Sequence, residues 1–242
     1  MKIIKQDQFG FLIPDVPTRY RANCAREWGL FVSGETGAMT AMQASEAGLT
    51  KGNFVELALC LTQERTLSFE PNYINEPFTE IWGIPTAGGM KDQFGENASE
   101  LSTFLLHRQS KDRMGMMLAG FGRQAFNAWV NDGMQANPEE FALTKMTEFF
   151  FTHIFRFEMV QTEGKYGTYF YVQATCKPAT SPLELSAIKA AQEIYQGHQN
   201  GLGYCTDPRI EDNETKCLAQ QQIIIEPITI PAKRALKASK AK

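Results

Sequence analysis

The side chains best suited to contact a ligand gather in residues 154–178, IFRFEMVQTEGKYGTYFYVQATCKP. Alternation along a strand puts Tyr169 and Tyr171 on one side of its second half, and Arg156 and Lys165 precede them. Flat rings beside cations can stack on unpaired bases and contact their phosphates. The pattern therefore predicts a stacking platform for a flat ligand such as a base. The alternative is that both tyrosines lie beneath another element as ordinary core.

Two strands joined by a short Gly-containing turn must position these groups. In the first strand, Arg156 and Glu158 are expected to point away from the core. The residues that alternate with the outward positions are apolar and form the expected buried face: Phe155, Phe157, Met159, Phe170, Val172, Ala174 and Cys176. A hairpin with one apolar face normally carries water-compatible residues on the other, so two tyrosines there are unusual.

Signatures of catalysis are absent from the sequence. It holds no GxSxG, HExxH, P-loop or dinucleotide-binding pattern, and the turn SGETG lacks the GK[ST] ending of a phosphate-binding loop. His153 beside Glu148 or Glu158 is a conceivable acid–base pair, but a strand histidine is usually structural. Cys176 is expected on the apolar face, where a thiol is normally inert. We therefore expect no enzymatic activity and no cofactor.

Metal binding would need clustered cysteine and histidine, and these residues are scattered. His198, Cys205 and Cys217 offer three zinc ligands with irregular spacing, and the acids between positions 207 and 214 lack the spacing of a calcium-binding loop. We expect no metal site. The five cysteines form no CxxC pair and no credible signal peptide precedes them, so free thiols and a cytoplasmic location are expected.

Length and composition favour one globular domain. The chain has 242 residues, 43% hydrophobic and 21% charged, which allows a substantial core, and no apolar run approaches a membrane span. We expect a single α+β domain over residues 1–230, with a flexible loop at residues 86–97. A basic tail, residues 231–242, is expected to follow it.

The basic tail makes the charge distribution asymmetric. It holds five Lys or Arg and no acid, whereas the first 230 residues carry 19 basic and 27 acidic groups, a net charge of −8. Lys233, Arg234 and Lys237 are therefore candidates for phosphate contact. The alternative is a solvated end that aids solubility.

Strands other than the hairpin are expected at residues 27–32, 53–62 and 222–230. The proline-rich segment 65–85 predicts edge strands or irregular connections, because proline cannot donate to a ladder. Residues 197–217 are expected to form a polar loop.

Helices are expected at residues 99–107, 112–130, 137–148 and 181–197. The last two carry the clearest signals. Asn137 before a proline, and Ser181 before another, are good caps for a helix that begins with proline. Glu184 completes a capping box with Ser181. Together the elements predict an α+β fold with a mostly antiparallel, partly closed, OB-like sheet and three or four flanking helices.

Two segments resemble known proteins. The pieces REWGLFV and FEMVQTEGKYGTYFYVQATCKP resemble an uncharacterised cyanobacterial family, which implies no catalytic residue. The second piece also resembles a strand pair of OB-fold single-stranded DNA-binding proteins of phages and plasmids. That resemblance implies nucleic-acid contact by Lys165, Tyr166, Tyr169 and Tyr171. Many such proteins end in an acidic tail, and the tail of this chain is basic.

Two functions remain open from the sequence. The first is a nucleic-acid-binding accessory protein that contacts single-stranded DNA through Arg156, Lys165 and the tyrosines, with the basic tail adding phosphate contacts. The alternative is a non-enzymatic interaction or assembly subunit of a bacterial or phage complex. Its surface would include Phe78, Trp82 and the segment Met114–Met117, binding a protein partner or a second copy.

Overall fold

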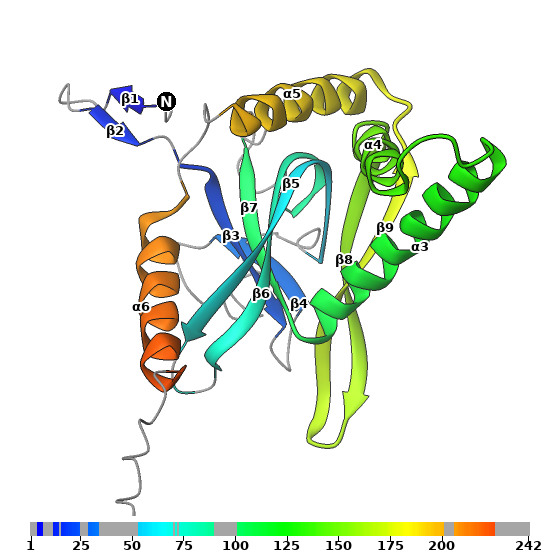
Figure 1. The fold of residues 1–242 in the computed structure, drawn as a ribbon. Coiled ribbons are helices and arrows are strands. Elements are labelled where there is room, and N and C mark those ends of the chain that lie inside the picture. The colour runs from blue at the N-terminus through cyan, green and yellow to red at the C-terminus, as the bar shows by residue number, and fades with distance from the viewer. Residues whose placement is uncertain are drawn as a thin grey trace, which may run out of the picture.

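The computed structural model describes residues 4–6, 12–14, 16–24, 29–33, 53–69, 71, 73–89, 101–200 and 206–225 (Figure 1). Its strands are β1 (Ile4–Gln6), β2 (Leu12–Pro14), β3 (Thr18–Cys24), β4 (Gly29–Ser33), β5 (Phe54–Phe69), β6 (Tyr73–Gly88), β7 (Ser102–His107), β8 (His153–Gly164) and β9 (Gly167–Pro178). Its helices are α3 (Gln109–Asn131), α4 (Pro138–Phe150), α5 (Pro182–Gln199) and α6 (Pro208–Ile225).

Seven of the strands form one sheet in the order β4-β3-β7-β6-β5-β8-β9, and β1 and β2 pair separately. Only β3 and β7 run parallel within the described sheet, through Thr18 opposite Ser102 and Arg19 opposite Thr103. The other neighbours are antiparallel. The sheet is therefore mixed but mostly antiparallel, as predicted.

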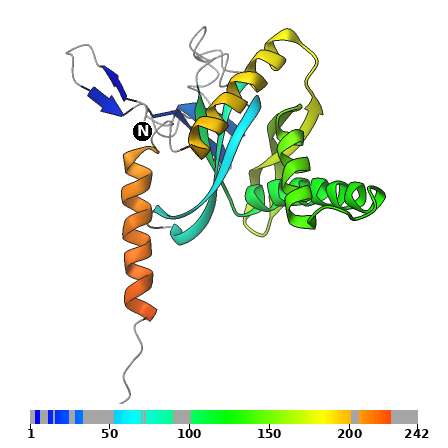
Figure 2. The ribbon, with the colours of Figure 1, turned by 45° about the horizontal axis from the view of Figure 1, so that its top comes forward.

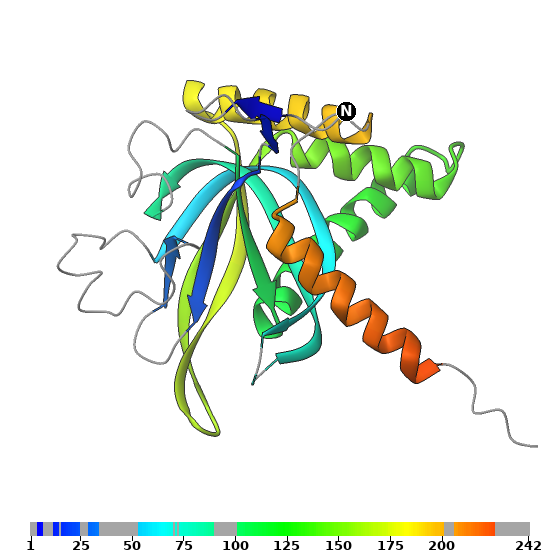
Figure 3. The same cartoon turned by 90° about the vertical axis from the view of Figure 1, so that its left-hand side faces the viewer.

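The sheet curls into a half-barrel (Figure 3). The long strands β5 and β6 change register at three places, near Glu56, Leu59 and Leu67. An extra residue in one strand bends it and increases its twist, which lets a long pair wrap around a core. A curled sheet with four helices among the described residues confirms the predicted α+β class and its partly closed sheet.

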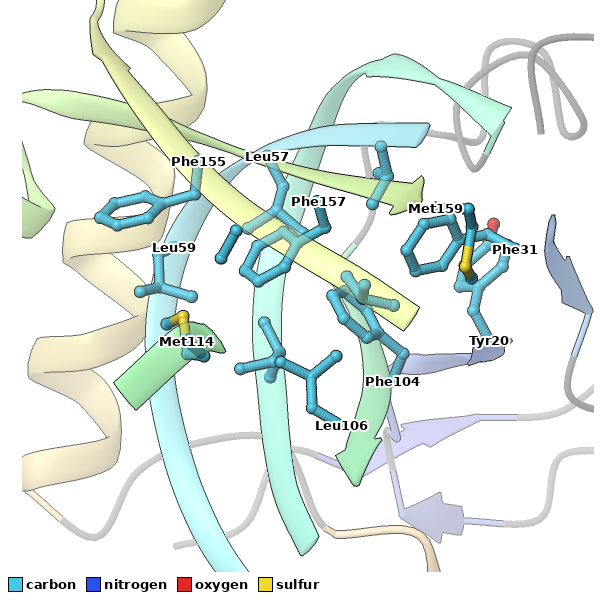
Figure 4. Packing of buried hydrophobic residues seen from close by; sticks show 14 residues of the cluster. Tyr20, Phe31, Leu57, Leu59, Phe104, Leu106, Met114, Phe155, Phe157 and Met159 are labelled. Carbon is cyan, nitrogen blue, oxygen red and sulfur yellow. The ribbon is translucent and has the colours of Figure 1, made fainter. Parts of the chain in front are cut away.

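The concave face of the sheet holds the main core (Figure 4). Alternate residues of the strands meet there in a single cluster: Tyr20, Phe31, Val55, Leu57, Leu59, Ile81, Phe104, Leu106, Phe155, Phe157, Met159, Val172 and Ala174. Met114 of α3 completes the cluster. The apolar face predicted for the β8–β9 hairpin belongs to this cluster and is confirmed.

Helices α5 and α6 cover the opposite face. Ala187, Ile188 and Ala191 of α5 pack on Trp82 and Ile84, which alternate with the concave-face residues of β6. Helix α6 places Ile210 against Leu67 and Phe78. Its polar side chains also reach β5 beyond the part that pairs with β8: Glu214 accepts from the Thr66 N–H at 3.2 Å and Asn213 from the Ser68 N–H at 2.8 Å. The helix thereby satisfies donors of an otherwise open strand edge.

The two strongest helix predictions are confirmed by their caps. Asn137 accepts hydrogen bonds from the N–H groups of Glu139 and Glu140 at the start of α4. Ser181 and Glu184 form the predicted capping box of α5. Helix α3 confirms the helix expected at 112–130 and begins three residues earlier.

Three element predictions are wrong. Residues 102–107 form strand β7, not a helix. Phe104 and Leu106 face the concave core while Thr103 and Leu105 face α6, so both sides are covered and a short apolar run mimics a helix.

The segment 65–85 contributes an interior strand, because β6 lies between β5 and β7. The two prolines of β6, Pro77 and Pro85, flank the stretch Phe78–Gly83 that is paired on both sides. The N–H group that each proline lacks therefore falls outside the part of β6 that pairs with both β5 and β7. Strand β6 also extends to Gly88, into the loop expected from residue 86, and residues 90–97 of that loop lie outside the described residues.

Residues 208–225 form helix α6 instead of the expected polar loop and strand. Asp207 caps it through the Arg209 N–H at 2.9 Å, and Pro208 is its first residue. This Asp-Pro start repeats the signal of α4 and α5, but the polar residues that follow it favour a loop when the sequence is read alone. Residues 226–230 of the expected strand lie outside the described part of the chain.

Candidate nucleic-acid interface

The β8–β9 hairpin extends beyond the rest of the sheet (Figure 1). The two strands pair over their whole length, from His153 opposite Pro178 to Gly164 opposite Gly167. Strand β5 pairs only with residues 155–158 of β8. Residues 160–171 thus form a two-stranded projection, called here the ribbon arm. Its charged residues are one acid, Glu163, and one base, Lys165.

The tip of the ribbon arm presents a cation and a ring together. Lys165 and Tyr166 form a two-residue turn, and Gly167 follows at φ 104°, a backbone conformation that favours glycine. The Tyr166 side chain is 75% exposed, and Lys165 Nζ lies 5.4 Å from the centre of its ring. Both groups are therefore accessible to a ligand, as the sequence predicts for a contact site.

Tyr169 and Tyr171 are half-buried, between the exposed and the core alternatives. Tyr169 donates a hydrogen bond from its hydroxyl to Gln109 Oε1 at 2.7 Å. Its ring also lies against Gly164, where an added Cβ would come within 2.8 Å of Tyr169 Cε1. These contacts fix the orientation of Tyr169 and tie it to the start of α3.

Tyr171 has a cationic neighbour that sequence reasoning missed. The guanidinium carbon of Arg113 lies 5.4 Å from the centre of the Tyr171 ring. Among the described residues, no carboxylate pairs with Arg113. Helix α3 reaches β9 because Ser110 Oγ accepts from the Val172 N–H at 2.9 Å, which covers the strand's outer edge. No local pattern in the sequence signals a contact between positions so far apart.

Arg156, by contrast, is not available as a free cation. It donates to Glu158 at 3.1 Å and to Glu56 at 3.1 Å, and its guanidinium lies 3.9 Å over the ring of Phe54. The hydrogen bond with Glu158 is the main cause that raises the pKa of Arg156. Arg156 and Lys165 are nine positions apart in the sequence, about 30 Å along an extended strand. The structure therefore does not bring these two predicted contacts together.

The remaining predicted contacts, Lys233, Arg234 and Lys237, lie outside the described residues.

Groups that could catalyse are engaged in other contacts. His153 stacks on Phe149 with ring centres 3.9 Å apart. The two carboxylates considered as its partners bond elsewhere, Glu148 with Lys145 at 2.8 Å and Glu158 with Arg156. Burial raises the pKa of the Cys24 thiol to about 11 and raises that of Cys176, so both disfavour the thiolate.

The part of the chain that the structure describes contains no group of three or more His, Cys, Asp or Glu able to hold a metal ion. His198 and Cys217 belong to it, and Cys205 does not.

A second candidate surface lies on the α3–α4 helix pair, which projects from the sheet (Figure 2). Helix α4 has no buried residue. The pair exposes large apolar side chains: Met116, Phe126, Val130, Met134 and Leu143. A cleft of about 340 Å³ lies between the two helices, lined partly by Phe121, Ala125 and Met146.

The interaction surface proposed from the sequence is partly wrong. Phe78, Trp82 and Met114 are buried in the cores, because Phe78 and Trp82 sit beneath α6 and α5 and Met114 enters the concave face. Of the segment Met114–Met117, Met116 is exposed.

The chain matches no protein-family model, and searches of the curated proteins and of the solved structures found no match either. The resemblance to OB-fold proteins therefore stays a prediction. None of the described helices is both long and apolar enough to cross a membrane.

Proposed function

We propose that this protein binds single-stranded nucleic acid, without catalysis, through the ribbon arm and the start of α3, as a cytoplasmic accessory protein of a bacterium or phage. The observation that carries the proposal is the projection of the arm, with Lys165 and Tyr166 accessible at its tip. Curled OB-type sheets bind oligonucleotides through strand faces and projecting loops. The fold supports this use of the arm.

Each group of the arm has its own part in the proposed contact. Tyr166 and Tyr171 stack on bases, and Lys165 and Arg113 contact phosphates. Tyr169 positions the platform, since its hydroxyl is bound to Gln109. Tyr166 and Tyr171 are five positions apart, about 16 Å along a strand, which leaves room for more than one nucleotide between their rings.

The expected affinity is modest. Each base–aromatic stack contributes on the order of 1–3 kcal/mol, and the proposed contact uses only two cations, Lys165 and Arg113. Glu56 and Glu158 occupy the adjoining sheet surface and disfavour a strand of phosphates there. Binding should therefore follow the arm and weaken with salt.

Fluorescence anisotropy with a labelled oligo-dT at low salt tests this proposal. The double variant Tyr166→Ala/Tyr171→Ala should bind at least about tenfold more weakly, because two stacks are lost. Tyr166→Trp should retain binding, because it keeps a flat ring at the tip.

Matched controls separate the arm from general effects. Tyr195→Ala removes a half-buried tyrosine of α5, and Lys189→Ala removes an exposed lysine of the same helix for comparison with Lys165→Ala. Both controls should bind as the parent does. If the double variant keeps its affinity and its circular dichroism, or if the parent shows no binding at low salt, the proposal is wrong.

The exposed apolar side chains of α3 and α4 favour a second function, assembly with a protein. Soluble monomers rarely expose large contiguous apolar patches, and such patches commonly mark interaction sites. This function does not exclude the first, since the patch and the arm tip are different surfaces. Its test is the oligomeric state.

A further inference from the structure

Helix α3 carries apolar or small residues on two faces, which lie about 110° apart around the helix axis at 100° per residue. One face packs inward: Met114, Met117 and Leu118 contact the concave core, and the ring of Phe121 packs against that of Phe149 of α4. The other face looks outward and consists of Gly115, Ala119, Gly122 and Phe126, called here the outer seam. A surface helix normally carries a single apolar stripe toward the core, so a second one indicates a further contact.

The outer seam has the spacing of a helix–helix contact. Its members recur at intervals of four, three and four residues, the pattern of a seam between paired helices. No described residue approaches within 4 Å of a Cβ built on Gly115 or Gly122. Phe126 is 56% exposed and Met116, on the flank of the seam, is 63% exposed. Nothing in the described fold therefore uses this face.

We infer that the occupant of the outer seam is a second copy of this chain, with the two α3 helices packed antiparallel about a twofold axis. The seam is self-complementary in that arrangement. When the axis passes between Gly120 and Phe121, Phe126 of each copy lies over Gly115 of the other. The same register sets Ala119 against Gly122, so that small residues allow the two backbones to come close.

Charges on the flank of the seam fit the same register. Asp112 and Arg123 are exposed on that flank. In the antiparallel pair, Arg123 of one copy lies about 9 Å along the axis from Asp112 of the other, at 1.5 Å per residue. This separation is within reach of the two side chains together. The symmetry supplies the ion pair twice, and the helix dipoles oppose each other favourably.

The size of the contact sets its strength. The seam and its flanks run from Asp112 to Val130, about 27 Å of helix. A single helix pair of this length falls near the lower limit for a specific interface, about 1,000 Å² in total, so we expect a dimer with a micromolar dissociation constant.

Sedimentation velocity of the full-length protein over a wide concentration series tests the inference. The parent should shift from monomer to dimer in the micromolar range. Gly115→Leu should raise the dissociation constant more than tenfold, because the leucine occupies the place of the partner's Phe126. The monomer tolerates this change, since the space around Gly115 is open.

Two further variants determine the register and the surface. Arg123→Asp should weaken the dimer, and Asp112→Arg added to it should restore the dimer by exchanging the charges. Leu143→Asp changes an exposed apolar residue of α4 outside the seam and should leave the dimer intact. Tyr166→Ala should also leave it intact, which separates this inference from the proposed nucleic-acid site.

A protein that stays monomeric at every concentration would overturn the inference. So would a dimer that survives Gly115→Leu, or one that Leu143→Asp dissociates, because either result places the contact on another surface. Failure of the charge exchange to restore the dimer would overturn the antiparallel register.

Discussion

At the scale of single residues, partners decide which predicted groups are available. Arg156 and Lys165 are both basic residues of the β8–β9 hairpin, yet Arg156 is held between Glu56 and Glu158 and Lys165 stands at an open turn. The cation beside Tyr171 is instead Arg113, from a different element. A residue type in a pattern therefore indicates a candidate, and the long-range partner determines whether the candidate is free.

Glu184 illustrates how one carboxylate serves several contacts. Hydrogen bonds from the backbone N–H groups of Ser181 and Thr180 are the largest causes that lower its pKa to about 2, and Lys177 adds to them. Its unfolded pKa is near 4.5. Because the folded pKa is the lower one, the contribution of Glu184 to stability is complete above about pH 4.5 and is lost as the pH falls toward 2.

We therefore predict that Glu184→Ala lowers the free energy of unfolding at pH 7 by about 1 kcal/mol, the usual worth of a helix cap. The difference from the parent should shrink as the pH falls from about 4.5 to 2. Urea denaturation at a series of pH values measures it. Glu193→Ala, in an exposed position of the same helix, is the control and should show no such trend. A difference that is constant with pH would contradict the assigned role.

Among the helices and strands, Gly120 of α3 and Gly83 of β6 differ in the space available for a side chain. Nothing lies within 4 Å of a Cβ on Gly120, on the α3 surface beside the outer seam. A Cβ on Gly83 of β6 would clash with Leu57 Cδ1 and come within 2.8 Å of the Ala58 carbonyl oxygen. We predict that Gly120→Ala raises the free energy of unfolding by up to about 1 kcal/mol, from helix propensity alone.

Gly83→Ala, the matched change, should lower the free energy of unfolding by about 1–3 kcal/mol, because the packed neighbours must move. Thermal denaturation followed by circular dichroism compares the two variants. Equal effects in the same direction would show that the environments described here are wrong.

Elements could be predicted from the sequence where the signal is local. The caps at Asn137 and Ser181 and the alternation through the β8–β9 hairpin depend on residues within a few positions of one another, and all three are confirmed. Strand β7 could not be recognised, because its two faces are covered by different parts of the fold and its short apolar run does not alternate as a half-buried strand would. The placement of Pro77 and Pro85 outside the doubly paired part of β6 likewise depends on where β7 ends.

At the scale of the whole molecule, the same limit explains the candidate site. The tip of the ribbon arm could be predicted, since Lys165 and Tyr166 follow from a local turn. The surroundings of Tyr169 and Tyr171 could not, because they depend on α3, which begins about 60 residues earlier in the chain. The sequence also shows the acidic body and the basic tail. The number of phosphate contacts that the arm and the tail each make is a separate question.

The salt dependence of oligonucleotide binding measures how many phosphates the protein contacts. Single-stranded nucleic acid releases counterions so that the logarithm of the binding constant falls with the logarithm of salt, with a slope of about −0.7 for each phosphate contacted. Two cations at the arm, Lys165 and Arg113, predict a slope of about −1.4.

If Lys233, Arg234 and Lys237 of the basic tail also contact phosphates, the full chain should give a slope of about −3.5. Deletion of residues 231–242 should then return the slope to about −1.4, while Tyr166→Ala should weaken binding without changing the slope. A slope that the deletion leaves unchanged would remove the tail from the interface, and a slope near zero in both proteins would show that neither surface contacts phosphate.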